Sequence, residues 1–180
     1  MPLLNDLKKN YKVTVIAPFD EYTNIIKQKG FNVENVSLKR SGMSILNDIF
    51  LIYQYLILIK KYKPDFLLSY TIKPNIYGNF ASVFSKTKNI NTITGLGTVF
   101  LKENILTSLV RILYKISFYF SSAVFFQNND DKEYFLKKNI IKESKAYIIG
   151  GSGIDLKYFK HYFDFSREPR FVLCTRRKKL

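Results

Sequence analysis

The chain has 180 residues and carries 29 Lys and Arg against 14 Asp and Glu, a formal net charge of +15. Its composition, 47% hydrophobic and 24% charged, is that of a globular protein and excludes a disordered one. So large a positive charge attracts nucleic acid, anionic lipid or a phosphorylated substrate, although a solvated lysine-rich surface gives the same balance. The single cysteine, Cys174, excludes an internal disulfide and favours a reducing compartment.

The sequence contains no segment with the pattern of a membrane span, which needs ~20 apolar residues. The apolar run 49–59 is too short, and the longer run 105–126 is interrupted by Arg111 and Lys115. The first residues lack the basic region and apolar core of a signal peptide. We therefore expect a cytoplasmic protein.

Apolar runs of strand length alternate along the chain with longer segments of helical periodicity. The expected strands are 13–17, 32–38, 66–70, 91–94, 123–127 and 146–149, and the expected helices are 22–29, 45–62, 76–85, 106–121 and 130–138. The strand 66–70 is apolar enough to be buried on both faces. This alternation predicts an α/β fold with a Rossmann-like, doubly wound and mainly parallel sheet. Ligands are then expected at the carboxyl ends of the strands.

The composition changes after Gly153, which suggests a domain boundary. Residues 156–180 contain eight Lys or Arg and only two acidic residues. Within them, 170–175 has the pattern of a strand with nothing after it to pack against. We predict a first domain at 1–155, and in 156–180 a crossover to a second domain and the start of that domain.

Two strand ends carry candidate binding residues. After strand 66–70 comes a Thr71-Ile72-Lys73-Pro74-Asn75 turn, in which Asn75 is expected to cap the next helix. Lys73 would then lie at a helix N-terminus, where an anion is favoured, although an ordinary turn with a solvated lysine is the simpler interpretation. After strand 91–94, Gly95 and Gly97 permit close approach of a ligand or form a tight turn.

The third glycine of a dinucleotide fingerprint does not follow Gly97, which excludes a nicotinamide or flavin site. The glycines at 150, 151 and 153 form either a phosphate-binding nest or a hinge, and no Walker lysine follows them. With one cysteine and one histidine, His161, the chain offers neither an N/S zinc site nor a plausible Ser-His-Asp triad.

The segment 104–122 has a narrow polar stripe that includes Arg111 and Lys115, and its other positions are mostly apolar. Such a helix suits an anionic membrane surface. The interior of an α/β fold gives almost the same pattern, and we favour that interpretation.

The motifs, in their order and spacing, resemble the N-terminal domain of family 4 retaining glycosyltransferases of the GT-B type. Among these, the chain is most similar to bacterial enzymes that extend lipid-linked glycans or build capsule and O-antigen units. The stretches that carry the resemblance are 20–23, 63–65, 71–78, 94–97, 113–115, 126–128 and 151–155 with Phe159.

The resemblance implies two Rossmann-like domains that face a cleft. The N-terminal domain holds the acceptor, and the C-terminal domain holds the nucleotide-sugar donor and a paired-glutamate motif. Three groups of residues follow by position. The acceptor-binding candidates are Thr71, Lys73, Asn75, Gly95, Gly97 and Asn128. The expected hinge contains Gly151, Gly153 and Asp155, and the residues expected to face membrane or phosphate are Arg111 and Lys115.

The chain departs from the family pattern at both ends. Family members have a strand before the stretch that matches residues 2–4, and a donor domain with its glutamates after 170–175. The resemblance therefore implies a fragment of a glycosyltransferase that is inactive alone. The complete enzyme would transfer sugar from a nucleotide sugar, as co-substrate and without a further cofactor or metal, to a polyprenyl diphosphate-linked glycan.

The expected setting is cell-surface polysaccharide or lipopolysaccharide synthesis, in peripheral contact with the cytoplasmic face of the inner membrane. A separately encoded C-terminal half is a further expected partner. The alternatives are a basic binding module for nucleic acid or anionic lipid, or an idle remnant. Nucleic acid is disfavoured because most of the 16 Phe and 13 Tyr fall at core spacing rather than beside cations.

Overall fold

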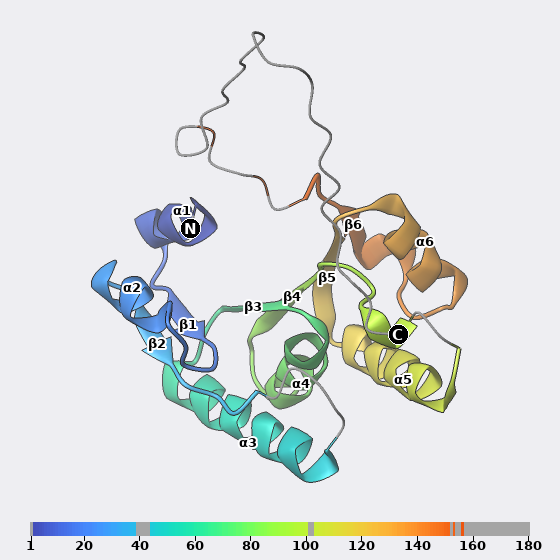
Figure 1. The fold of residues 1–180 in the computed structure, drawn as a ribbon, viewed down its shortest axis with the longest axis horizontal. Helices are drawn as coiled ribbons and strands as arrows, with labels where there is room; N and C mark the ends of the chain where they lie inside the picture. Colours follow the sequence, from blue (N-terminus) through green and yellow to red (C-terminus); the bar gives the residue numbers. More distant parts are fainter. Residues whose placement is uncertain (1, 39–43, 101–102, 152, 154–155, 157–180) are drawn as a thin grey trace, which may run out of the picture.

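The computed structural model describes residues 2–38, 44–100, 103–151, 153 and 156 (Figure 1). Strands and helices alternate along the chain, as the sequence predicts. In chain order the elements are α1 Pro2–Asn10, β1 Thr14–Ile16, α2 Thr23–Gln28, β2 Asn32–Glu34, α3 Ile45–Tyr62, β3 Phe66–Tyr70, α4 Ile72–Ser82, β4 Lys88–Ile93, α5 Ile105–Tyr119, β5 Ser121–Phe126, α6 Asn129–Lys137 and β6 Ala146–Ile148.

All strand pairs are parallel, which confirms the predicted α/β fold class. The strands form two sheets rather than one: β1 pairs with β2, and β3, β4, β5 and β6 pair in that order. Among the described residues, β1 has no strand partner besides β2, and β3 has none besides β4.

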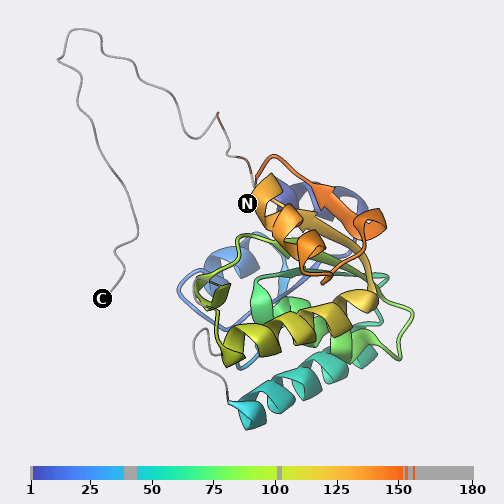
Figure 2. The ribbon, with the colours of Figure 1, turned by 90° about the vertical axis from the view of Figure 1, so that its right-hand side faces the viewer.

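Helices α3, α4 and α5 lie side by side against one face of the larger sheet (Figures 1 and 2). The central helix α4 packs against α3, α5, β3 and β4, and seven of its eleven residues are buried. On the same side of the sheet, Ser69 of β3, Asn91 of β4 and Val124 of β5 are buried. This face, with α4 against it, is the interior of the molecule.

The opposite face of β3 corrects the prediction that this strand is buried on both faces. Phe66, Leu68 and Tyr70 are 45%, 39% and 40% exposed, whereas Ser69, which points the other way, is 5% exposed. The apolar run was correctly assigned to a strand. Burial of its second face depends on a covering element, and none of the described elements covers it.

The start of α4 differs from the prediction by four residues. The helix begins at Ile72, so Pro74 lies in its first turn, where a residue without an N–H is tolerated. Asn75 is then inside the helix, and its backbone N–H donates to the carbonyl oxygen of Thr71 at 3.1 Å. The prediction that Asn75 caps this helix is therefore wrong.

The core combines an aromatic cluster with a buried polar network. Phe135 is fully buried, and its ring centroid lies 5.3 Å from those of Tyr114 and Phe126. Beneath the ends of β3 and β4, the Asn91 side-chain amide donates to the Oδ1 atoms of Asn75 and Asn79, each at 3.2 Å. These asparagines are all 0% exposed, so α4 is fixed to β4 by hydrogen bonds as well as by packing.

No helix within the described residues is both long and apolar enough to cross a membrane.

Candidate functional site

The carboxyl ends of the parallel strands β3, β4, β5 and β6 share one edge of the larger sheet. The segments that leave this edge begin at Thr71, Thr94, Gln127 and Ile149. Three groups of predicted residues, around Thr71, at Gly95 to Gly97 and at Asn128, therefore reach the edge from three different strands. Such an edge is where an α/β fold holds its ligands.

Thr71 has an unusual backbone conformation, with φ at +67° and ψ at 169°. A non-glycine residue in this region costs about 1–3 kcal/mol, and strain of this kind is often found at functional sites. Thr71 is exposed, and its side chain does not cap α4. The hydroxyl at the end of β3 is thus available to a ligand at this edge.

The glycine loop after β4 lies against the start of α4. Gly95 and Gly97 have φ values of +133° and +73°, which side-chain-bearing residues rarely adopt. A Cβ atom built on Gly97 would lie 3.6 Å from Cδ1 of Ile72, whereas one on Gly95 would meet no atom within 4 Å. The loop therefore lies next to the Thr71 turn and leaves backbone exposed at Gly95. Ile72, which makes this contact, was missed by the sequence analysis.

Lys73 forms a largely buried ion pair with Asp48. Its Nζ atom donates to Oδ1 of Asp48 at 2.8 Å, and the two side chains are only 17% and 10% exposed. Burial, helped by a hydrogen bond to Asp48, raises the pKa of the neighbouring Tyr77. This cluster ties α4 to α3. The sequence offered one signal for it, because Asp48 is the only acidic residue within α3.

Asn75 is fully buried and donates to the carbonyl oxygen of Thr92 at 3.0 Å. Asn128 is the N-cap of α6: its side chain accepts from the N–H of Asp131 at 2.8 Å and donates to the Asp131 carboxylate at 2.9 Å. Asn75 therefore supports the edge from below, and Asn128 lies at the edge as an exposed helix cap.

Arg111 and Lys115 lie on α5 and line a second feature, a cavity of about 330 Å³ between α5 and the end of α6. Arg111 forms a two-pronged pair with Glu103, at 3.0 and 2.7 Å, which raises the pKa of the guanidinium. Lys138 also lines the cavity and was not among the predicted residues. It is 23 positions from Lys115 in the sequence, so no local spacing pattern links the two.

The predicted hinge is only partly described. Gly151 and Gly153 have φ values of +85° and +66°, and a Cβ on either would meet no atom within 4 Å. Asp155 and nearly all of 156–180 lie outside the described residues, so the domain boundary stays a prediction. In the described part of the chain, no three His, Cys, Asp or Glu residues gather closely enough to hold a metal ion.

Comparison with known proteins identifies relatives of the chain. Residues 1–128 match the family described as glycosyl transferase 4-like. The chain is 30% identical, over 181 aligned residues, to the N,N'-diacetylbacillosaminyl-diphospho-undecaprenol alpha-1,3-N-acetylgalactosaminyltransferase of Campylobacter jejuni. The alignment covers 95% of this chain and 47% of that enzyme, so the chain spans about half of its relative.

Solved structures share the fold at lower sequence identity. A glycosyltransferase from Rickettsia africae superposes with a TM-score of 0.65 at 18% identity, over 88% of this chain and 38% of that protein. MurG from Acinetobacter baumannii superposes with a TM-score of 0.56 at 9% identity, over 85% and 40%. The UDP-GlcNAc 2-epimerase of Methanocaldococcus jannaschii superposes with a TM-score of 0.59 at 18% identity, over 82% and 40%. The matched family region and the shared architecture agree, and the chain belongs to the glycosyl transferase 4-like family.

Proposed function

We propose that the chain is the acceptor-binding half of a glycosyltransferase whose acceptor is a glycan on a polyprenyl diphosphate. The observation that carries the proposal is the 30% identity, over 95% of the chain, to an enzyme named for a diphospho-undecaprenol acceptor. The strained Thr71 turn and the Gly95–Gly97 loop, side by side at the carboxyl edge, support it.

The carboxyl edge suits a sugar acceptor because it combines an exposed hydroxyl with exposed backbone. The Thr71 hydroxyl and the N–H and C=O groups around Gly95 can bond to sugar hydroxyl groups without a charged side chain. Their positions are fixed in advance by the φ values of the two segments and by the contact of Gly97 with Ile72. Pre-organised groups of this kind lose less entropy on binding than mobile ones.

The donor site belongs, in this proposal, to a second half of the enzyme. The chain spans 47% of its relative, and the nucleotide sugar would bind the remainder as a co-substrate. We expect the two halves to act together at the cytoplasmic face of the membrane that holds the acceptor. Without the second half the electrostatic stabilisation of the departing nucleotide is absent, and the chain alone transfers no sugar.

Acceptor binding is tested by calorimetric titration of the chain with a water-soluble, short-prenyl diphosphate glycan. We expect Gly97→Ala and Thr71→Val each to weaken binding by about tenfold, the equivalent of one lost or misplaced hydrogen bond. Gly30→Ala is the matched control, because Gly30 has a positive φ of +76°, close to the +73° of Gly97, but lies between α2 and β2, outside this edge. Lys73→Met is expected to leave the affinity unchanged, because Lys73 is engaged with Asp48.

Three results would contradict the proposal. The first is that the folded chain does not bind the glycan, and the second is that the Gly97 and Thr71 variants bind it as tightly as wild type. The third is tight, salt-sensitive binding of RNA in place of the glycan. Release of nucleotide from a nucleotide sugar by the chain alone would overturn the expected inactivity. Transfer that appears only after the second half is added would support it.

A further inference from the structure

The outer side of α5 carries an exposed apolar stripe. Ile105, Leu109, Ile112 and Ile116 are 88%, 40%, 54% and 49% exposed and follow one another at helical spacing. Tyr114 and Phe118, on the inner side, are each 2% exposed. The expectation that this helix is buried is therefore correct for one side only.

Helix α3 has a similar stripe, which its apolar pattern did not distinguish from core. Leu46, Ile49, Phe50, Tyr53 and Ile57 are 80%, 58%, 51%, 57% and 46% exposed. They occupy positions i, i+3, i+4, i+7 and i+11, so they share one side of the helix. The inward residues of α3, among them Leu51 and Ile59, are buried.

The two stripes flank one layer of the molecule. Helices α3 and α5 lie on either side of α4, which is covered by both of them and by the sheet (Figures 1 and 2). We call the exposed sides of α3 and α5 the outer helix face. No other described element packs over the residues of these stripes, and exposed apolar surface of this extent marks an interaction site.

The charges around the outer helix face are almost all positive. Within α3 and α5 the only acidic residue is Asp48, which is buried against Lys73. In the cavity beside α5, Arg111 is neutralised by Glu103, whereas Lys115 and Lys138 are exposed and have no ion pair among the described residues. Apolar side chains are thus bordered by two uncompensated cations.

We propose that the outer helix face docks on an anionic lipid bilayer. This inference rests on the proposed function, because a polyprenyl diphosphate acceptor is held in a membrane, and it names the surface that meets that membrane. The apolar stripes would enter the interface to about 5–10 Å, as an amphipathic helix does. Lys115 and Lys138 would pair with lipid phosphates, in the cavity that the two lysines line.

A bilayer fits the outer helix face better than a second copy of the chain. Each copy of the chain carries a net charge of +15, so two copies repel one another as they approach. Like charges in an interface oppose association. An anionic surface turns Lys115 and Lys138 into attractive contacts.

The apolar part is tested by flotation of the full chain with vesicles of phosphatidylcholine containing phosphatidylglycerol. We expect Ile112→Ser together with Ile116→Ser to reduce the partition coefficient by about tenfold or more, since each isoleucine loses its buried apolar contact. Ile25→Ser is the matched control. Ile25 is 46% exposed, close to the 49% of Ile116, but it lies on α2 beside the smaller sheet.

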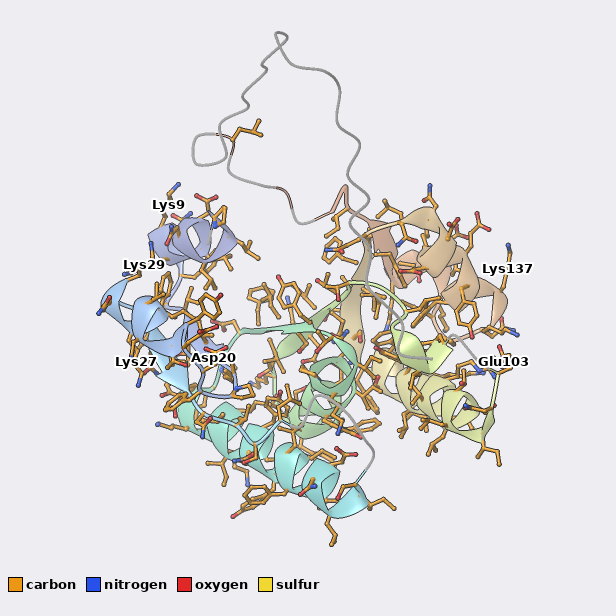
Figure 3. The ribbon with its side chains drawn as sticks, in the orientation of Figure 1. Lys9, Asp20, Lys27, Lys29, Glu103 and Lys137 are labelled. Atoms are coloured by element: carbon orange, nitrogen blue, oxygen red, sulfur yellow. The ribbon has the colours of Figure 1, made fainter. Side chains whose placement is uncertain are left out.

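The charged part is tested with Lys115→Gln together with Lys138→Gln. Each cation near an anionic surface contributes about fivefold to binding, so loss of the pair should weaken binding about 25-fold, and this loss should shrink at high salt. Lys12→Gln with Lys29→Gln removes the same charge elsewhere. Lys29 lies on the opposite side of the molecule from Glu103, the partner of Arg111 beside this cavity (Figure 3).

The inference is overturned if wild type fails to float with anionic vesicles, or if control and test variants bind equally. It is also overturned if the isoleucine variants convert a dimer into a monomer without changing flotation, which would assign the face to a second copy. Titration with the soluble diphosphate glycan separates it from the proposed function. A chain that binds this glycan but no vesicle disproves the docking surface alone, and the reverse disproves the acceptor site alone.

Discussion

The two sheets of this chain differ in how many buried apolar residues pack against them. Among the described residues, the apolar core cluster has eighteen buried members, and only Val36 of these precedes α3. Strands β1 and β2 have three residues each, no residue of β1 is fully buried, and α1 buries none. The half that contains β3 to β6 therefore carries most of the stability, while the half that contains β1 and β2 depends on its attachment to α3.

This difference predicts two levels of stability in one chain. Regions with few buried apolar contacts open locally at low free energy, while a packed core opens only with the whole molecule. The candidate site at Thr71, Gly95 and Gly97 belongs to the well-packed half, on segments that leave β3 and β4. Its geometry should survive local opening of β1 and β2.

Truncation of one phenylalanine in each half gives the largest expected contrast. Phe135 is 0% exposed at the centre of the aromatic cluster, and Phe31, the residue before β2, is 5% exposed. We expect Phe135→Ala to lower the free energy of global unfolding by about 4 kcal/mol. Phe31→Ala should instead accelerate amide hydrogen exchange in β1, β2 and α2, with little change in the midpoint of urea unfolding.

Phe84→Ala is the control for both variants, because Phe84 is 98% exposed and its truncation should change neither measurement. If Phe31→Ala destabilises the whole molecule as much as Phe135→Ala does, the division into two levels of stability is wrong.

The sequence predicted those elements whose signals are local. The bounds of α3 and β3 agree with the structure because an apolar periodicity and the Lys63-Pro64 stop define them. β4 was predicted to begin at Asn91, but it begins at Lys88, because Lys88 and Asn89 look like loop residues until the hydrogen bond of Asn89 to Ser82 on α4 is known. Pairing between distant residues, as in Lys73 with Asp48, leaves no signal in the spacing.

The candidate site was also predictable only where its residues have a local signal in the sequence. Glycines and a strand end mark Thr71, Gly95 and Gly97 in the sequence, and the structure brings these residues together at one edge. The cavity between Arg111, Lys115 and Lys138 depends on how α5 packs against the end of α6, which no periodicity encodes. Exposure of the α3 and α5 stripes likewise depends on which elements cover them. A covered apolar side and an exposed one have the same pattern in the sequence.

The asparagine network tests whether polar contacts also hold the larger half together. Asn91 donates to Asn75 and Asn79, and its Oδ1 accepts from Ser121 Oγ at 2.7 Å. Asn91→Ala removes a hydrogen bond from each of these buried partners and should cost about 3 kcal/mol of global stability in urea unfolding. Asn24→Ala, at an exposed position in α2, should change it by less than about 0.5 kcal/mol. A loss no larger than that of the control would mean that α4 is held by packing alone.

The smallest expected effect concerns the attachment of β2 to α3. Glu34 of β2 accepts hydrogen bonds from Lys61, at 2.7 Å, and from the hydroxyl of Tyr62, and these bonds lower the pKa of the Glu34 carboxyl below its ordinary value of 4.5. A carboxyl group whose pKa is lower in the folded state stabilises the fold at pH values above its ordinary pKa. This contribution is lost as the pH falls through the pKa of the folded state.

The Glu34 carboxylate is 24% exposed and its lysine partner 56%, so solvent weakens the pair and its contribution to stability is small. We expect Glu34→Gln to speed hydrogen exchange of the β1 and β2 amides about twofold relative to wild type at pH 7. At pH 3 the two proteins should exchange at more similar rates, since both then lack much of the carboxylate charge. Comparing the two proteins at the same pH cancels the intrinsic pH dependence of exchange, and Glu21→Gln, an exposed position without an ion pair among the described residues, is the control. An equal ratio at both pH values would show that β2 is attached to α3 by apolar contacts, and the smaller half would then open independently of this ion pair.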